Sequence, residues 1–343
     1  MMKSEVIVMN EERNVTLTAY IQEAGGEFGF EKRPAMLVMP GGGYAMCSDR
    51  EADPVAMTYL QAGYQAFILR YTTNKKGKWP MPLEDYEEAM EIIRSRSEEW
   101  HIDADKIVIS GFSAGGHLAA VAATQAKHRP AAAVLVYPAI LEDIVDMCQP
   151  GMPYPYQNVT RETCPCFFAA CRDDKTVDIT NTLRMELALA EHDIPFESHI
   201  YSFGSHGFST GEDWVITNGV SERVPNWTKD SIGWLKETLG KLTYHGFEEP
   251  EQRVSLNADY APVLSIACSL GHMKKQNEEV QTLLRPMYDG MALVAKARGY
   301  QLEGLQLVLS KNTVSEIMEM LQMAPKEIKE IDTVLHGIVN ELE

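Results

Sequence analysis

The sequence predicts an α/β protein, in which a mostly parallel sheet carries helices on both faces and a small helical module follows. Two observations predict this arrangement. From residue 35 to about residue 240, short apolar segments alternate with amphipathic ones, as strands and helices do in a doubly covered parallel sheet. Beyond residue 244 the helical patterns continue without convincing strands. We therefore expect a large α/β domain over residues 1–243, a linker over 244–251 and a helical module over 252–343.

The predicted strands are short runs of apolar, often β-branched residues. They cover residues 5–9, 15–21, 35–39, 65–70, 106–110, 132–137, 166–170 and 196–201. Only a short polar segment joins the first two strands, which are therefore expected to pair antiparallel. In a sheet of this kind functional sites lie at the carboxyl ends of the parallel strands. The loops that follow these ends are the first candidates for a site.

Helices are predicted where apolar residues recur at intervals of three and four. They cover residues 53–62, 81–100, 114–126, 178–192 and 225–239, and in the module about 276–298, 312–323 and 325–342. Thr313 and Glu316 have the spacing of a capping box, and Pro325 suits a first helical turn. The many methionines and leucines of the module fit helical core packing. Three roles stay open for it: docking on the α/β domain, a homo-oligomer interface, or part of a lid.

Composition excludes several classes of function. The 343 residues carry a formal net charge of −18 and no basic cluster that could hold phosphates, so nucleic acid and anionic membranes are poor partners. No segment approaches the roughly 18 consecutive apolar residues of a membrane span, and the first residues lack the apolar core of a signal peptide. The six cysteines contain no C-x-x-C pair. For the close pair Cys164 and Cys166, reduced thiols in a cytoplasmic protein are favoured over a redox or metal role.

The most informative motif is a glycine-flanked serine, Ser113, within Gly111-Phe-Ser-Ala-Gly115. It follows the predicted strand 106–110 and precedes the predicted helix 114–126. A strand, a sharp turn and a helix form the setting of a nucleophile elbow, in which a serine with strained backbone exposes its hydroxyl above the sheet. Gly111 and Gly115 remove the side chains that would collide in so tight a turn. Ser113 is therefore the candidate nucleophile.

A serine hydroxyl needs a base that takes its proton and a carboxylate that orients this base. Asp173 and Asp174 follow the predicted strand 166–170, and Asp174 is the favoured carboxylate of the two. Of the nine histidines, His206 alone stands in a glycine-rich loop after the next predicted strand. His117, on the helix after the elbow, is interpreted as a packing or capping residue.

The third requirement is a set of backbone N–H groups that stabilise a developing oxyanion. Three consecutive glycines within residues 40–44 follow the predicted strand 35–39. Gly42 and Gly43 are the expected donors, together with Ala114, the residue after the candidate nucleophile. A flexible turn or a phosphate loop is the alternative, but the G-x-x-x-x-G-K-[ST] pattern of a phosphate loop is absent.

These elements occur in the order Ser, Asp, His, and residues 35–240 resemble the acetyl-esterase and lipase branch of the α/β-hydrolases, particularly its acetylxylan-esterase and feruloyl-esterase-like members. The motifs that carry the resemblance are Pro-Gly-Gly-Gly-Tyr at 40–44, Arg-Glu-Ala-Asp-Pro-Val-Ala at 50–56, Gly-Phe-Ser-Ala-Gly-Gly-His-Leu-Ala-Ala at 111–120, Asp-Lys-Thr-Val at 174–177 and Ser-His-Gly-Phe at 205–208. The resemblance implies an α/β-hydrolase fold, a triad of Ser113, Asp174 and His206, and no metal or cofactor. Pro40 departs from the better-known esterase loop, which has histidine there, and this leaves open how the loop is braced.

The resemblance implies two-step acyl transfer from a small-molecule ester to water. The segment 138–165 stands where such enzymes carry a cap, and here it is short. With the tight glycine loop, this favours a small acyl group, such as acetyl on a sugar or xylo-oligosaccharide. Tyr154 and Tyr156 in the segment, with Tyr44 and Trp214, are the expected substrate-binding side chains.

Two other functions use the same pattern. A peptidase of the prolyl-oligopeptidase type has the same order of triad residues, but it usually adds a β-propeller, and the chain shows no blade-like repeat. A catalytically silent binding protein on a hydrolase fold normally lacks one of the three residues, whereas all three are present here.

Overall fold

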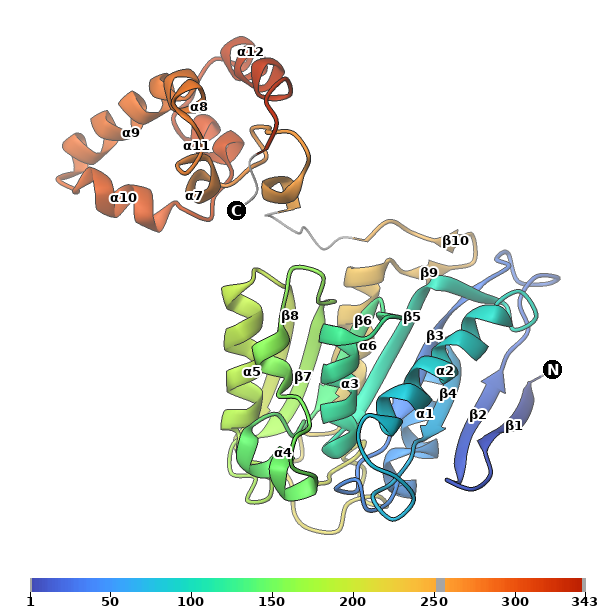
Figure 1. Ribbon diagram of the computed structural model, residues 1–343. Coiled ribbons are helices and arrows are strands. Elements are labelled where there is room, and N and C mark those ends of the chain that lie inside the picture. Colours follow the sequence, from blue (N-terminus) through green and yellow to red (C-terminus); the bar gives the residue numbers. More distant parts are fainter. Residues whose placement is uncertain (1, 251–256, 341–343) are drawn as a thin grey trace. The chain divides into compact units, whose positions relative to one another are not determined.

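The computed structural model describes residues 2–250 and 257–340 (Figure 1). It divides into two compact units, residues 1–252 and residues 253–343. No helix in the described ranges has both the length and the apolar character that spanning a membrane requires.

An eight-stranded sheet forms the centre of the first unit (Figure 1). Its strands are β1 (Lys3–Asn10), β2 (Val15–Ile21), β3 (Arg33–Met39), β4 (Gln65–Arg70), β5 (Ile102–Phe112), β6 (Ala132–Val136), β7 (Cys166–Cys171) and β8 (Phe196–Tyr201). Their spatial order is β1-β2-β4-β3-β5-β6-β7-β8. The pairs β1–β2 and β2–β4 are antiparallel, and every other pair is parallel. The predicted fold class is therefore confirmed.

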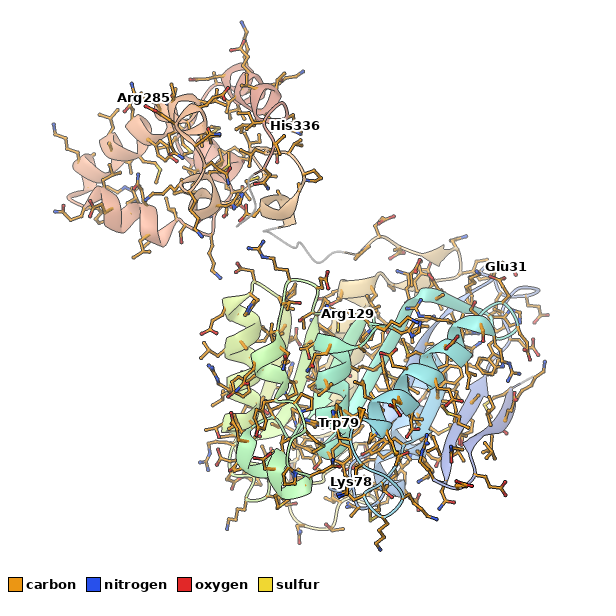
Figure 2. The ribbon with its side chains drawn as sticks, in the orientation of Figure 1. Glu31, Lys78, Trp79, Arg129, Arg285 and His336 are labelled. Atoms are coloured by element: carbon orange, nitrogen blue, oxygen red, sulfur yellow. The ribbon has the colours of Figure 1, made fainter. Side chains whose placement is uncertain are left out.

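Because six neighbouring strands run in the same direction, their carboxyl ends meet at one edge of the sheet. Figure 2 labels a residue on each side: Trp79, in the segment after β4, lies at this carboxyl edge, whereas Arg129, just before β6, lies at the opposite edge. The candidate nucleophile Ser113 directly follows β5. It therefore stands at the edge where ligands bind in sheets of this kind.

Helices cover both faces of the sheet. They are α1 (Asp53–Gln61), α2 (Met81–Ser95), α3 (Ala114–Gln125), α5 (Thr180–Glu191) and α6 (Asn226–Leu239). The buried side chains of α2, α3 and α5 pack on one face, and those of α1 and α6 on the other. In β3, Leu37 faces the first group and the neighbouring Met36 and Val38 face the second, since successive side chains of a strand point to opposite faces. Burial on both faces is why the inner strands are almost entirely apolar.

The predicted linker is wrong at its start. Residues 244–247 belong to a short antiparallel hairpin of β9 (Leu242–Thr243) and β10 (Gly246–Phe247), which ends the first unit. The ammonium group of Lys106, on β5, lies 4.7 Å from the ring centre of Phe247 and so ties the hairpin to the sheet. Periodicity could not reveal strands of two residues. Residue 251 lies outside the described residues.

The second unit is helical. Its helices are α7 (Leu270–Met273), α8 (Glu278–Leu283), α9 (Arg285–Arg298), α10 (Leu302–Val308), α11 (Val314–Met320) and α12 (Pro325–Leu335), with a 3₁₀ turn, η3 (Asn257–Tyr260), before them. The predicted helix 276–298 is two helices, because Pro286 has no N–H to continue α8 and instead stands in the first turn of α9. The capping box of Thr313 and Glu316 is confirmed. α12 ends well before the predicted residue 342.

A buried polar network connects the two ends of the described module. The Asn340 side-chain amide donates to the carbonyl oxygens of Asp259 and Ala261, each at 2.8 Å. Its oxygen lies 2.7 Å from His272 Nε2. The Asp259 carboxylate accepts hydrogen bonds from both the amide and the hydroxyl of Ser269. Since these groups are buried, each bond that is lost leaves a polar atom without water as a substitute.

We predict that Asn340→Ala lowers the free energy of unfolding of the second unit by about 2–4 kcal/mol, because two buried carbonyls lose their donor. Hydrogen exchange of α7 and α12 across a urea series, read by mass spectrometry on the full chain, measures this change. Lys326→Ala is the control, since Lys326 is exposed and pairs with Glu330 at 3.8 Å, its one ion-pair partner among the described residues. An equal effect of the two substitutions would contradict the role of the network.

Candidate active site

Ser113 sits in a strained turn between β5 and α3. Its backbone angles are φ 53° and ψ −115°, a region that non-glycine residues rarely adopt. The Ser113 N–H donates to the carbonyl of Val136 at 3.1 Å, and the Ser113 carbonyl accepts from His117 N–H at 2.9 Å. These bonds hold the strain in place and direct the hydroxyl away from the sheet. The elbow predicted from the motif is therefore present.

The glycines of the elbow are required by close backbone contacts. A β-carbon on Gly111 would lie 2.2 Å from the carbonyl oxygen of Gly115. One on Gly115 would lie 2.1 Å from the carbonyl oxygen of Met39 and 2.4 Å from that of Pro40. Real β-carbons do not approach backbone atoms so closely, so neither position can carry a side chain without moving β3 or α3.

Gly115→Ala should therefore destabilise the first unit by about 3 kcal/mol or more, an overpacking effect against backbone that cannot yield. The matched control is Gly233→Ala in α6, where an added β-carbon meets no atom within 4 Å. This second change should leave stability unchanged or raise it by about 0.5–1 kcal/mol, because alanine favours a helix. Thermal unfolding of both variants tests the contrast, and a stable Gly115→Ala protein would contradict it.

Three side chains from distant parts of the sequence meet at the elbow. His206 Nε2 lies 2.8 Å from the hydroxyl oxygen of Ser113, and His206 Nδ1 lies 2.7 Å from Asp174 Oδ2. The other oxygen of Asp174 accepts the N–H groups of Thr176 at 2.8 Å and Val177 at 3.1 Å. These two hydrogen bonds orient the Asp174 carboxylate independently of its contact with His206. Serine, imidazole and carboxylate are thus arranged in line, as proton transfer from the serine requires.

The alternative carboxylate, Asp173, has a different position. Its Oδ1 accepts the N–H of Gly204 at 2.8 Å, at the start of the loop that carries His206. Asp173 therefore holds the backbone of this loop, whereas Asp174 contacts the imidazole itself. Which of the two aspartates contacts His206 depends on the direction of each side chain, and the order of residues in the sequence does not predict that direction.

The glycine loop faces the serine across a cavity. Gly42 and Gly43 have φ of 129° and 59°, and both line the cavity. Their N–H groups make no hydrogen bond to any residue within 2–250 or 257–340. Ala114 lines the same cavity as the first residue of α3, where an N–H has no partner within the helix. The three predicted donors thus line the same cavity as Ser113 and stay candidates for binding an oxyanion there.

The cavity around Ser113 has a volume of about 400 Å³. One wall comes from a helix that the sequence did not predict, α4 (Glu142–Cys148), which contributes Ile144, Met147 and Cys148. The remaining lining residues outside the elbow and the glycine pair are Met46, Ser48, Arg50, Glu51, Ala139, Thr176, Val177, His206 and Gly207. The lining of the cavity therefore combines apolar and polar side chains.

None of the four expected substrate-binding aromatics is among the residues that line this cavity. Tyr44 is 1% exposed and turns into the core. The hydroxyl groups of Tyr154 and Tyr156 donate to Asp146 and Glu142 of α4, so both residues hold this helix from behind. Trp214 is 72% exposed and absent from the lining. The direction of an aromatic side chain in a loop depends on the path of the loop, which residue order alone does not reveal.

His117 is buried and connects the glycine loop to the cap segment. Its Nε2 lies 2.8 Å from the carbonyl oxygen of Pro153, which can only accept, so Nε2 carries the proton. Its Nδ1, 2.8 Å from the Tyr44 hydroxyl, is then the acceptor. Burial lowers the pKa of His117 to about 4, and this neutral tautomer persists at physiological pH. The predicted packing role is consistent with these contacts.

Since His117 resists protonation only when folded, it makes stability depend on pH. The stability that neutral His117 contributes is fully present above about pH 6.5, the pKa of histidine in the unfolded chain. This stability is lost as the pH falls toward 4. The shift corresponds to about 3 kcal/mol. Denaturant unfolding at a series of pH values should show this loss in the native chain and a shallower slope in His117→Gln. Identical slopes would contradict the assignment.

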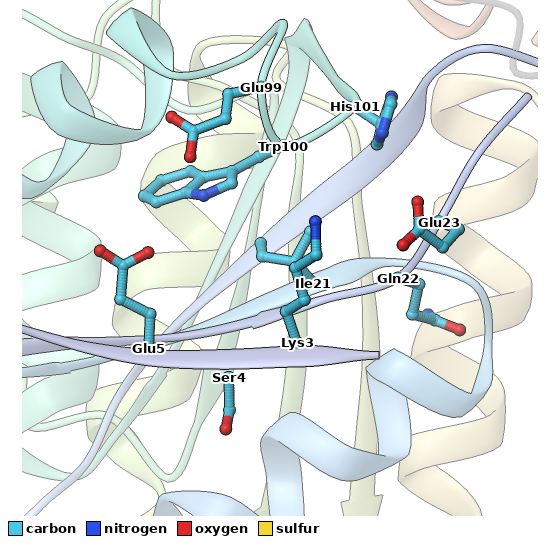
Figure 3. A pocket seen from close by; sticks show the side chains of 9 residues that line it. All are labelled: Lys3, Ser4, Glu5, Ile21, Gln22, Glu23, Glu99, Trp100 and His101. Atoms are coloured by element: carbon cyan, nitrogen blue, oxygen red, sulfur yellow. The ribbon is translucent and has the colours of Figure 1, made fainter. Parts of the chain in front are cut away.

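A second hollow lies at the opposite edge of the sheet, where Lys3 pairs with Ile21 (Figure 3). Its volume is about 70 Å³. Two of the carboxylates around it, Glu5 and Glu99, bind the guanidinium of Arg96 at 2.9 and 2.7 Å. Its charged groups thus form surface ion pairs. The cavity at Ser113 is therefore the candidate active site.

The chain is similar to known proteins in sequence and in fold. The BD-FAE family matches residues 28–150. The crystal structure of MGS-M1, an α/β-hydrolase enzyme from a Medee basin deep-sea metagenome library, is 38% identical and has a TM-score of 0.64, over 69% of this chain and 98% of that one. That of an acetyl ester-xyloside bifunctional hydrolase from Caldicellulosiruptor lactoaceticus is 28% identical with a TM-score of 0.60, over 68% and 95% of the two chains.

Among curated proteins, an acetylxylan esterase of Xylanibacter ruminicola is 29% identical over 217 residues, which make up 57% of this chain and 45% of that protein. The chain spans less than half the length of the curated relatives that it matches. The match to nearly all of MGS-M1 and the shared sheet show that the chain belongs to the α/β-hydrolase family.

Proposed function

We propose that the chain is a serine esterase that removes small acyl groups, acetyl foremost, from carboxylic esters of sugars such as xylo-oligosaccharides. The observation that carries this proposal is the contact of His206 with both Ser113, at 2.8 Å, and Asp174, at 2.7 Å. The N–H groups of Gly42 and Gly43, which have no hydrogen-bond partner in the described part of the chain, support it further.

In the proposed reaction the Ser113 oxygen attacks the ester carbonyl while His206 Nε2 takes the serine proton. The carbonyl oxygen becomes an oxyanion, which the N–H groups of Gly42, Gly43 and Ala114 stabilise. When the intermediate collapses, the alcohol leaves with the proton from His206, and the acyl group stays on Ser113. Water, activated by His206, then releases the acid and restores the serine. Asp174 holds the imidazole in the required tautomer and stabilises its charged form.

The choice of acetylated sugars rests on relatives and on the cavity. One relative is named an acetylxylan esterase and another an acetyl ester-xyloside bifunctional hydrolase. On this chain, the lining of the cavity includes apolar side chains, such as Ile144 and Met147 of α4, and polar side chains, such as Ser48 and Thr176. The apolar side chains can contact a short acyl group, and the polar ones can bind a hydroxyl-rich alcohol.

Ser113→Ala should lower kcat by about 10³-fold or more with the fold intact, since the nucleophile and its acyl intermediate are lost. Asp174→Asn should also lower kcat strongly, because an amide favours the wrong tautomer of His206. The measurement compares p-nitrophenyl acetate, butyrate and octanoate with acetylated xylo-oligosaccharides, with Ser113→Ala as the blank.

Acetate release from the sugars, absent in the blank, supports the proposal in full. Turnover of the activated esters alone supports the triad and rejects the sugar substrate. A preference of about tenfold or more for butyrate or octanoate would contradict the small acyl group. Hydrolysis that survives in Ser113→Ala would contradict the triad, and a complete lack of turnover would favour a silent binding protein.

A further inference from the structure

Glu51 is a buried charged residue at the cavity that the proposed reaction does not use. It ends a short 3₁₀ turn, η1 (Asp49–Glu51), between the glycine loop and α1, and is 3% exposed. Its Oε2 accepts the N–H of Gly41 at 2.8 Å, and its Oε1 accepts the hydroxyl of Tyr137 at 2.8 Å. A buried carboxylate is costly unless both oxygens have donors. Here both do, so the charge can be kept inside the protein.

The contact with Gly41 braces the glycine loop from behind. A β-carbon on Gly41 would lie 2.7 Å from Glu51 Oε2 and 3.0 Å from the β-carbon of Ser113, so this residue is held between the carboxylate and the serine. The Gly41 N–H is bound to Glu51, so the N–H groups of the next two residues, Gly42 and Gly43, are the ones that we expect to bind an oxyanion in the cavity. The Tyr71 hydroxyl holds the Pro40 carbonyl at 2.7 Å. The loop is thus held at both Pro40 and Gly41.

The contact with Tyr137 reaches the loop of the catalytic histidine. The Tyr137 oxygen accepts the N–H of Ser209 at 2.9 Å, which leaves its own proton for Glu51. The Tyr137 ring packs edge-on against the His206 imidazole, with ring centres 4.8 Å apart. Arg50, the neighbour of Glu51, donates to the carbonyls of Gly207 at 3.1 Å and Val215 at 2.8 Å. The turn η1 therefore holds both loops at once.

The carboxyl group of Glu51 also lies close to the loop that carries His206. A β-carbon on the next residue, Gly207, would lie 4.0 Å from Glu51 Oε1. Burial raises the pKa of Glu51, and the bonds from Tyr137 and Gly41, with the charges of His206 and Arg50, oppose this rise. The ionisable groups that face His206 are thus Asp174 at Nδ1, Glu51 and Arg50 from η1, and Tyr137 after β6. Those that face Glu51 are Tyr71, Tyr137, Arg50 and His206.

We propose that Glu51 is a positioning residue, which holds the glycine loop and the histidine loop in one frame and stabilises the imidazolium form of His206 by its negative charge. The inference rests on the proposed esterase reaction. Asp174 orients the imidazole by direct contact, whereas Glu51 acts on it through space and on the oxyanion donors through Gly41. Both effects increase as the transition state develops its charges, so they act on kcat more than on KM.

The test is Glu51→Gln, which keeps the shape of the side chain and removes its charge. With p-nitrophenyl acetate between about pH 5 and pH 9, kcat should fall about tenfold or more while KM stays within about threefold. The midpoint of the acid limb of kcat/KM should move to lower pH by about half a unit or more, because the imidazolium loses a stabilising charge. The His206 ring titration, followed by NMR in folded protein, should move in the same direction.

Glu186→Gln is the matched control. Glu186 lies on the far helix α5, and its partly buried carboxylate also accepts a hydrogen bond from a hydroxyl, that of Ser198. It should leave kcat and the midpoint unchanged. In folded Glu51→Gln, an unmoved midpoint in both kinetics and NMR overturns the proposal. The NMR titration decides this even if the wild-type chain has no Ser113-dependent turnover, an outcome that would reject the esterase reaction instead.

If Glu51→Gln does not fold, Tyr137→Phe tests the frame. This change removes the hydroxyl that donates to Glu51 and cuts the link from Glu51 to Ser209. We expect kcat to fall about fivefold or more. A folded Tyr137→Phe protein with the kcat of the wild type overturns the proposed frame.

Discussion

The active-site arrangement depends on one backbone contact, that between the end of β3 and the start of α3. At Gly115 the helix passes so close to the carbonyls of Met39 and Pro40 that a β-carbon would lie 2.1 and 2.4 Å from them. This approach brings the glycine loop, which continues β3, beside the serine that begins α3. If the helix stood one side chain further out, the N–H groups of Gly42 and Gly43 would be too far from an oxyanion at Ser113.

The parallel sheet brings the carboxyl ends of its strands together, and with them the loops that carry the other site residues. Ser113 follows β5, Asp174 follows β7 and His206 follows β8, so residues far apart in sequence meet at one edge. Backbone N–H groups then fix the loops: those of Thr176 and Val177 hold Asp174, and that of Gly204 is held by Asp173. The site therefore consists of short loops whose positions are set by β-strands and by hydrogen bonds between loops, with His117 and Glu51 as buried polar anchors.

The residues of the candidate site were predictable to very different degrees. Ser113, Asp174 and His206 could be chosen because the elbow demands glycines at fixed places and the other two follow successive strands. The pocket aromatics could not. Tyr44 stands next to the glycine loop in sequence, yet its side chain turns inward to His117. Glu51 was missed as well, although it lies in the quoted motif at 50–56, because a lone glutamate before a helix is most often solvated.

By itself, the sequence determined the alternation of strands and helices, the elbow, the glycine loop and the order of the three candidate catalytic residues. These features obey local rules, since periodicity, β-branching and the backbone freedom of glycine act within a few residues. Only the tertiary structure decided that α4 forms part of the cavity wall and that Glu51 joins two loops. The physical reason is that these depend on partners distant in sequence: a buried carboxylate, like an aromatic ring, is placed by whichever donors and surfaces the folded chain brings to it.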